Sequence, residues 1–140
     1  MANEHYKTNV LRHFNEALNQ GHLHTIEEIY APEYVLHAPV SNGDTRGHDQ
    51  LKERVVTFRT GFPDIHFSVD QMIAEGNSVS ARYTFRGTHT GQFGPLAPTG
   101  KWIEVPGIIV FRFDEKGLMH EGWSCFDSMD MMQQLGLGPA

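Results

Sequence analysis

The spacing of apolar residues changes once along this chain, and that change restricts the fold more than any other feature of the sequence. Before Pro63, apolar residues recur every three or four positions, as they do on one face of an amphipathic helix. After Pro63 they alternate with polar residues, which is the period of a strand that buries one face. Helices followed by strands, rather than alternating with them, are typical of α+β proteins.

Two helices are predicted in the first thirty residues. The first covers His5 to Gln20, because its apolar side chains fall on one face. The second is a short helix that ends at Ile29. Thr25 and Glu28 have the spacing of a capping box, so we expect Thr25 to cap the start of this second helix.

A third helix is predicted after an extended segment at 34–37 and a turn-rich stretch at 41–47. Its apolar residues share one face up to Pro63, which ends it because the residue before a proline is unfavourable in a helix. The first half of the chain therefore supplies three helices to the fold.

Four long strands are predicted after Pro63. They cover approximately 65–73, 79–86, 102–113 and 118–126. Turns at 75–77 and 115–117 join them as antiparallel hairpins. Crossover helices are missing between the strands, so a parallel sheet is disfavoured. A last short helix is predicted from Ser128 to Gln134.

The connection from Gly87 to Lys101 is longer than an ordinary link between two strands. It is rich in Gly, Pro and Thr, it contains Phe93, and Trp102 follows it directly. Long ordered loops are often binding loops, so these apolar residues are suited to a pocket mouth. They are equally suited to packing over an open end of the sheet, and the sequence favours neither alternative.

Composition limits the partners and the compartment. A length of 140 residues fits one domain covering 1–140, and no linker or repeat divides it. Eleven Lys and Arg against seventeen Asp and Glu give a net charge of −6 without a basic stripe, so nucleic acid is not an expected partner. No apolar run approaches the roughly 20 residues of a membrane span, and no signal peptide is recognisable. We expect a cytoplasmic protein that does not bind membranes.

Motifs for cofactors and metals are missing. The chain has no glycine-rich dinucleotide motif after a strand, no phosphate loop and no serine nucleophile elbow. Nine histidines are present, but none lies in a His-Glu-x-x-His motif, and the single cysteine, Cys125, cannot form an internal disulfide. We therefore expect neither a cofactor nor a bound metal.

Asp127 is the carboxylate that the pattern singles out. Trp123 and Asp127 share one face of the last predicted strand. If Trp123 faces the interior, Asp127 meets an apolar pocket, where burial raises the pKa of a carboxyl towards the range of a general acid–base. Asp127 also precedes the last helix and could cap it. On the pattern alone the cap is favoured.

Other residues could contact a substrate. His37, at the end of an apolar segment, could orient or polarise a substrate oxygen, or it could bond only to nearby backbone. His89 could reach a ligand from the long loop or lie in solvent. Aromatic side chains at strand spacing could stack on a flat substrate, although such residues are more often plain core. Those with this potential are Tyr83, Trp102, Phe111 and Trp123, together with Phe93 of the loop.

Several motifs, taken in their order along the chain, resemble the SnoaL-like polyketide cyclase family. They are Phe62-Pro63-Asp64, Arg86-Gly87-Thr88-His89-Thr90-Gly91 with Phe93, Pro98-Thr99-Gly100, Phe111-Arg112, the turn at Gly117, and Trp123-x-x-x-Asp127 followed by Gln133-Gln134-Leu135-Gly136. Each motif is weak alone, but together they cover nearly the whole chain and are specific.

The resemblance implies the nuclear-transport-factor-2-like fold, a cone of curved antiparallel sheet packed on three helices around one pocket. It also implies a homodimer or higher homo-oligomer formed through the sheet. Relatives that act on polyketides close a ring of a hydrophobic carbonyl compound by aldol condensation, without a cofactor. Asp127 resembles their acid–base, which reverses the preference for a simple cap.

Two other functions stay open. The resemblance leads us to expect a histidine on a neighbouring strand, but residues 102–113 contain none, so His37 or His89 would have to replace it. A non-catalytic protein that binds small molecules is therefore one alternative. An epoxide hydrolase is another, and it would need Arg82 or Arg112 beside Asp127 and a second carboxylate.

Overall fold

The computed structural model describes residues 2–38 and 44–137. The helical elements are α1 (Ala2–Arg12), its π-helical continuation η1 (His13–Asn19), α2 (His24–Ile29), α3 (Gly47–Gly61) and α4 (Ser128–Gln134). The strands are β1 (Tyr30–His37), β2 (Thr45–Arg46), β3 (His66–Glu75), β4 (Ser78–Thr88), β5 (Trp102–Phe113) and β6 (Met119–Phe126). The three predicted helices, the four long strands and the last helix are confirmed. Part of the turn-rich stretch at 41–47 lies outside the described residues.

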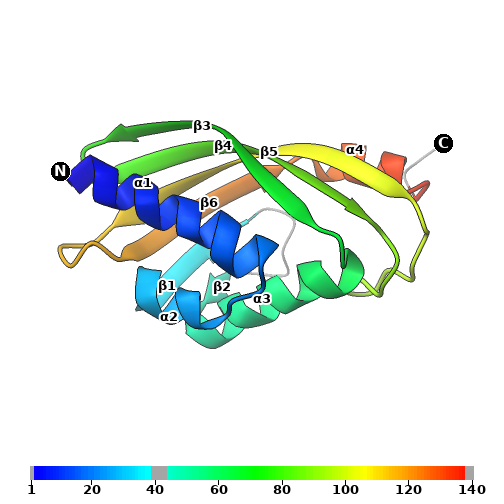
Figure 1. Cartoon of the computed structure of the whole chain (residues 1–140), viewed down its shortest axis with the longest axis horizontal. Helices are drawn as coiled ribbons and strands as arrows, with labels where there is room; N and C mark the ends of the chain where they lie inside the picture. Colours follow the sequence, from blue (N-terminus) through cyan, green and yellow to red (C-terminus); the bar gives the residue numbers. More distant parts are fainter. Residues whose placement is uncertain (1, 39–43, 138–140) are drawn as a thin grey trace.

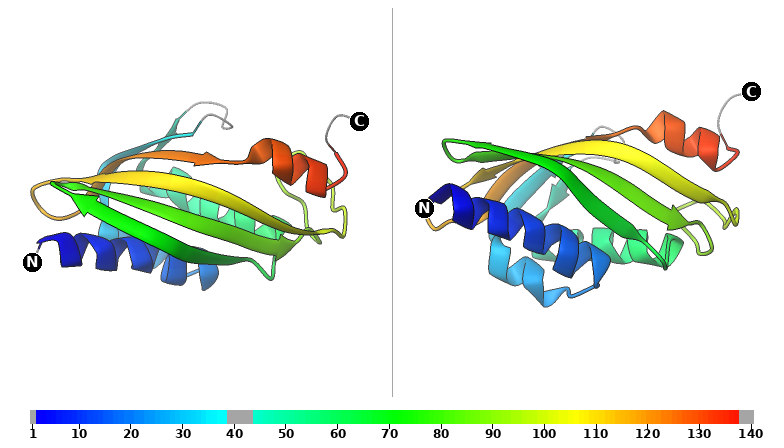
Figure 2. Two further views of the ribbon diagram at one scale, coloured as in Figure 1. Left: turned by 90° about the horizontal axis from the view of Figure 1, so that it is seen from above. Right: turned by 45° about the horizontal axis from the view of Figure 1, so that its top comes forward.

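The six strands form one curved sheet in the order β2-β1-β6-β5-β4-β3. Helices α1, α2 and α3 lie on one face of this sheet, and α4 lies beyond the end of β6 (Figures 1 and 2). The fold is α+β, as predicted. One pair of strands departs from the antiparallel sheet that the resemblance implies, because β1 pairs with β6 in parallel. The chain reaches β6 from β1 only after α3 and the long hairpins, so this pair needs no tight turn.

The predicted capping box at the start of the second helix is also wrong. Helix α2 begins at His24, and no side chain caps it. The Thr25 hydroxyl instead donates to the Glu16 carboxylate at 2.9 Å. Thr25 thus ties the second helix to η1, a tertiary contact that local spacing cannot reveal.

The core lies between the helices and the inner face of the sheet. Along β4, the residues predicted to alternate inward are buried: Val79, Ala81, Tyr83 and Phe85. Along β6 the expectation fails, because Trp123 is 43% exposed on the outer face and Ser124 is buried. A register shift between β5 and β6 next to Phe113 places Met119 inside and Trp123 outside. An irregularity of this kind reverses the faces of the residues that follow it.

Two glycines of the inner face make room for tyrosine side chains. A Cβ at Gly122 of β6 would overlap the hydroxyl of Tyr34, and one at Gly107 of β5 would overlap the ring of Tyr83. Both glycines therefore serve close packing against an aromatic ring. In the described ranges, no helix has the length and apolar content that a membrane span requires.

Gly122→Ala should lower the free energy of unfolding by about 1–3 kcal/mol, the usual cost of overpacking a core. Tyr34→Phe removes the hydroxyl that the new methyl group would meet. We therefore expect the double variant Gly122→Ala, Tyr34→Phe to recover part of the loss, as measured by urea unfolding of the two single variants and the double variant. Strictly additive losses would contradict the assigned contact.

Candidate functional site

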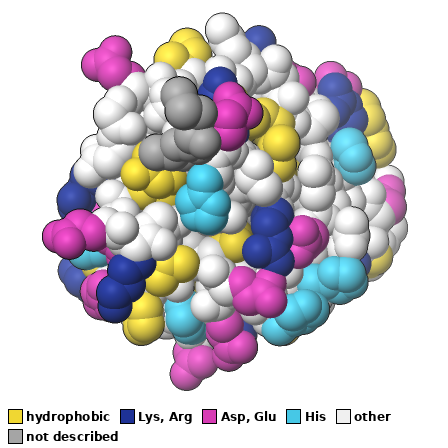
Figure 3. Space-filling view, turned by 60° about the vertical axis from the view of Figure 1, so that its left-hand side comes forward, with side chains coloured by type: hydrophobic (Ala, Val, Ile, Leu, Met, Phe, Trp, Pro, Cys, Tyr) yellow, Lys and Arg dark blue, Asp and Glu magenta, His cyan; other side chains and the backbone are white. Residues whose placement is uncertain are grey.

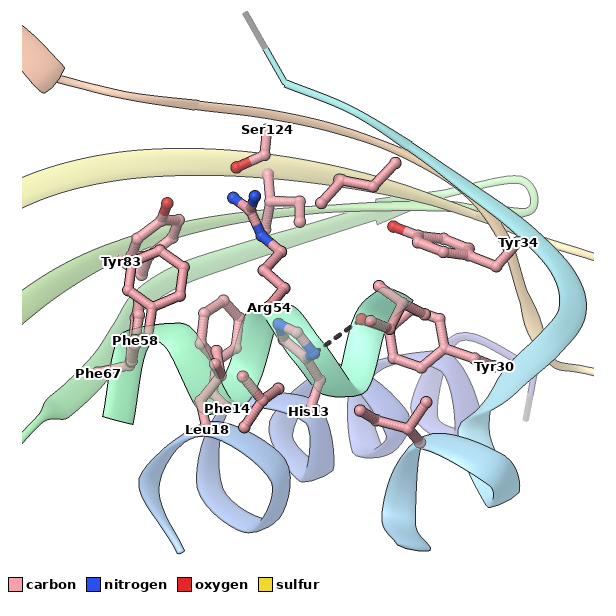
Figure 4. Close-up of a pocket in the computed structure, with 15 residues that line it drawn as sticks. His13, Phe14, Leu18, Tyr30, Tyr34, Arg54, Phe58, Phe67, Tyr83 and Ser124 are labelled. Carbon is pink, nitrogen blue, oxygen red and sulfur yellow. Dashed lines mark hydrogen bonds between the residues drawn. The ribbon is translucent and has the colours of Figure 1, made fainter. Parts of the chain in front are cut away.

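An internal cavity of about 50 Å³ lies between the helices and the inner face of the sheet. Most of its wall is apolar, with Phe14, Phe58 and Phe67 among the residues that line it. Figure 4 shows polar groups from both layers that point into this apolar space. A volume of this size holds a few water molecules, whereas sites for drug-sized ligands enclose roughly 300–1,000 Å³. A substrate therefore requires lining side chains to move.

Arg54 brings a cation into this cavity. It comes from α3, and its guanidinium points across the space towards Ser124 of β6 (Figure 4). Burial lowers the pKa of Arg54 from its ordinary value of 12.5. An arginine nevertheless keeps its proton in proteins, so the cavity carries a positive charge. Such a charge interacts more strongly here than in water, because the surrounding dielectric is low.

His13 and Tyr30 form a hydrogen-bonded pair beside Arg54. The His13 Nδ1 lies 2.7 Å from the Tyr30 hydroxyl. Desolvation, followed by the charge of Arg54, lowers the pKa of His13 from 6.5 to about 3. Burial raises the pKa of Tyr30 well above its ordinary value. Both partners are therefore neutral at neutral pH.

The π-helical turn of η1 begins at His13 and carries His13, Phe14 and Leu18 into the cavity wall. Segments with this wider turn are rare and occur frequently at functional sites. Sequence reasoning assigned no role to His13, Tyr30 or Arg54. A usable signal was present, because His13 lies on the apolar stripe of its helix and Arg54 lies between Leu51 and Phe58 on another.

Two more tyrosine hydroxyls belong to the cavity. The Tyr34 hydroxyl is buried and has no hydrogen-bond partner within residues 2–38 and 44–137. Tyr83 forms a side-chain hydrogen bond with Ser124, which lowers the pKa of Tyr83. Burial has the larger effect and raises this pKa. Burial raises the pKa of Tyr34 as well. Both phenols thus stay protonated and can donate hydrogen bonds to a bound oxygen.

Asp127 does not reach this cavity. Its side chain is exposed, and its carboxylate accepts the backbone N–H of Asp130 at 3.0 Å, which caps α4. The prediction that Trp123 faces inward and carries Asp127 into a pocket is wrong, because the register of β6 turns that face outward. The cap, which the pattern alone favoured, is the contact observed.

His37 and Trp123 lie together on the outer face of the sheet, and their ring centroids are 5.6 Å apart. The His37 Nε2 lies 2.8 Å from a Glu121 oxygen, and its Nδ1 lies 3.2 Å from Asp44. Hydrogen bonding to Glu121, followed by Asp44, raises the pKa of His37. His37 and Trp123 border an open groove of about 510 Å³ together with Ile108. This groove lies on the side opposite to the cavity.

The long loop packs over the end of the sheet. His89 is buried, its Nδ1 lies 3.1 Å from the Thr99 hydroxyl, and its ring stacks on Phe62. Phe93 packs on Phe58 and Phe62. Of the two alternatives for this loop, packing is therefore the one observed. His89 does not lie in solvent and does not line the cavity, because the loop encloses its ring.

The remaining predicted pocket residues lie in different parts of the molecule. Tyr83 lines the cavity. Phe111 is buried behind it against the rings of His13 and Tyr30, and Trp102 is 56% exposed on the outer face.

The arrangement expected of an epoxide hydrolase is missing. Arg82 lies 3.8 Å from Asp70 on the outer face, and Arg112 pairs with Glu121 there. Within the described part of the chain, no carboxylate lines the cavity. A different group of possible metal ligands, Glu33, Asp114 and His120, lies outside the cavity.

A family model described as SnoaL-like polyketide cyclase matches residues 8–135, which is most of the chain. This chain belongs to the SnoaL-like polyketide cyclase family. The resemblance read from its motifs is therefore confirmed, and the fold is the nuclear-transport-factor-2-like one of this family. No curated protein sequence matches the chain.

Solved structures agree with the family. A candidate SnoaL-like polyketide cyclase from Jannaschia sp. CCS1 is 23% identical, with a TM-score of 0.87 over 98% of this chain and 95% of that one. IdmH, a candidate polyketide cyclase from Streptomyces antibioticus, is 29% identical, with a TM-score of 0.80 over 94% of this chain and 98% of that one. A candidate cyclase from Acidithiobacillus ferrooxidans is 28% identical, with a TM-score of 0.84 over 96% of both chains.

The low pKa of His13 makes stability depend on pH. Between pH 6.5 and about 3 the unfolded chain binds a proton at His13 that the folded chain does not, so the free energy of unfolding falls as the pH is lowered. The slope from this group is at most about 1.4 kcal/mol per pH unit. We expect His13→Gln to have a shallower slope between pH 6 and 4 in urea unfolding. If the free energy of unfolding of the two proteins had the same dependence on pH, the low pKa given to His13 would be contradicted.

Proposed function

We propose that this protein is a cyclase or related isomerase that acts on a hydrophobic carbonyl compound bound in the internal cavity. Membership of the SnoaL-like family supports the class of reaction. The observation that carries the proposal is the position of Arg54, a cation in an apolar cavity that also contains a histidine and three tyrosine hydroxyls. Such a site is complementary to an oxygen that becomes negative during the reaction.

Removal of a proton beside a carbonyl leaves an enolate, whose negative charge is largely on oxygen. In the proposed complex this oxygen lies next to the Arg54 guanidinium, and the Tyr34 hydroxyl donates a hydrogen bond to it. Tyr34 suits this role because its buried hydroxyl has no partner in the described structure. Donors that are fixed before the charge develops are usually the largest single contribution to catalysis.

His13 is the group that we propose to accept the proton. Its second ring nitrogen then acts as the base, while Nδ1–H donates to the Tyr30 oxygen. A pKa near 3 makes the empty site weakly basic. The positive charge of Arg54 contributes to the low pKa of His13. An enolate bound to Arg54 offsets that charge, and its own negative charge stabilises the protonated form of His13. Attack of the enolate carbon on a second carbonyl of the same molecule then closes a ring, and holding both groups in place lowers its barrier. The oxygen of that second carbonyl becomes an alkoxide, which takes the proton back from the His13 imidazolium.

Binding of an anionic oxygen tests the role of Arg54. The coloured probe 4-nitrophenol should bind as the phenolate, so that its apparent pKa in the complex is lower than in water. Arg54→Met should weaken phenolate binding at least tenfold, because it removes the cation and keeps the chain length. Asp127→Asn is the control, since asparagine also caps a helix and the residue lies outside the cavity. Equal losses in both variants would contradict the proposed site.

A second candidate function is binding without catalysis, and the absence of a carboxylate from the cavity wall of the described structure favours it. Deuterium exchange separates the two functions. We expect the wild-type protein to accelerate exchange of the acidic C–H of a bicyclic 1,3-diketone in D₂O, as followed by NMR, and His13→Gln to reduce that rate at least tenfold. Saturable binding of the diketone without accelerated exchange would instead identify a binding protein.

We also infer that copies of the chain associate through the outer face of the sheet. This face exposes apolar side chains around the groove, including Ile108 and Trp123. Exposed apolar patches of this kind are typical of interfaces between proteins. Ile108→Glu should therefore convert an oligomer into monomers in sedimentation experiments, while Glu115→Gln, in the β5–β6 turn, should not. A monomeric wild-type protein would contradict the inference.

A further inference from the structure

A group of possible metal ligands lies at the end of the molecule that holds the β5–β6 turn. Glu33 belongs to β1, Asp114 follows β5 and His120 lies on β6. One ligand atom from each residue lies within 4.8 Å of the others. Figure 3 looks towards this end, where histidine and acidic side chains occur side by side. The three segments meet where the pairing of β1 with β6 is irregular, between Tyr30 and Val35.

Asp114 is held in place by its own turn. Its Oδ1 accepts the backbone N–H groups of Lys116 at 2.9 Å and Leu118 at 3.0 Å. Two bonds to backbone fix the carboxylate before any ligand arrives. Metal ligands are commonly oriented by hydrogen bonds of this kind.

His120 presents a ring nitrogen that lacks a partner. Its Nδ1 is buried and makes no hydrogen bond within the described structure. The nearest acidic oxygen belongs to Glu33 and lies 3.9 Å from this nitrogen, which is too far for a hydrogen bond. Buried polar atoms without partners are rare, and a bound ion is one of the ordinary explanations.

We propose that Glu33, Asp114 and His120 bind a divalent transition-metal cation, for which Zn²⁺ is the best match. Zinc takes imidazole nitrogen and carboxylate oxygen at about 2.0–2.2 Å, and three protein ligands leave a position for water. Ligand atoms of a tetrahedral site are then about 3.3 Å apart. The group therefore has to contract, which Glu33 allows because its side chain is 66% exposed.

The charges of the site also favour a cation. Two carboxylates beside a neutral imidazole carry two negative charges, and a divalent ion neutralises them. Hard cations such as Mg²⁺ prefer sites made of oxygen alone, so the imidazole selects a transition metal. A bound ion would join β1, β6 and the β5–β6 turn. The proposal is independent of the cyclase reaction, because none of the three residues lines the cavity.

Titration of chelator-treated protein with Zn²⁺, followed by calorimetry, tests the site directly. We expect one ion per chain with a Kd below 100 μM, and a rise of several degrees in Tm at saturating Zn²⁺. Co²⁺ should give visible absorption bands of a nitrogen- and oxygen-liganded ion. Both readouts are independent of any enzymatic activity.

Three conservative variants locate the ion. Glu33→Gln, Asp114→Asn and His120→Gln should each weaken Zn²⁺ binding at least tenfold. Asp114→Asn keeps the oxygen that accepts the two backbone N–H groups, so the turn should remain folded, which circular dichroism would check.

The paired rings of His22 and His24, 5.7 Å apart, form a rival place for a metal and provide the control. The double variant His22→Gln, His24→Gln should bind Zn²⁺ with the same affinity as the wild-type protein. Loss of binding in this control, equal affinity in the three site variants, or no saturable binding below 1 mM Zn²⁺ would overturn the proposal.

Discussion

The pairing of β5 with β6 determines what the interior of this protein can contain. Ser124 lies opposite Ile109, and Trp123 lies opposite Val110. Because directly opposite residues share a face, Ser124 enters the interior and Trp123 faces outward. A slip of one residue would exchange the two faces. The small hydroxyl of Ser124 leaves the space into which Arg54 extends, so the charge of the cavity depends on this register as much as on α3 (Figure 4).

Burying a cation, an imidazole and three phenols in a protein interior is energetically unfavourable. Removing polar groups from water costs free energy unless hydrogen bonds replace the lost hydration. His13 with Tyr30 and Tyr83 with Ser124 satisfy part of this requirement. The Tyr34 hydroxyl leaves part of it unmet. A site of this kind is prepared for an oxygen-containing ligand, whose binding would supply the missing partner.

Periodicity in the sequence predicted the helices, the long strands and the inward residues of β4, because local spacing controls those features. It failed at β6, because the register shift beside Phe113 depends on pairing between strands. The pattern alone favoured the cap that Asp127 forms, and the resemblance to the family favoured an acid–base in a pocket, which Asp127 does not reach. Periodicity does not identify His13 and Arg54 as site residues, because both interrupt apolar stripes and the cavity that they enter is formed only when the helices pack on the sheet. The contact of Thr25 with Glu16 joins two helices and has no local signature.

The wide turn of η1 has a consequence for how this protein tolerates changes in length. A π-helical turn contains about one residue more than an α-helical turn. Loss of a single residue there can restore the regular helix with little rotation of one flank relative to the other, because the wider turn accommodates the extra residue. Loss of a residue from the regular helix α1 would instead rotate one flank by about 100°. Val10 is buried on the N-terminal flank, and Phe14 and Leu18 are buried within η1 itself. A one-residue deletion within η1 is therefore easier to accommodate than a deletion in α1, which would turn Val10 or Phe14 away from the core.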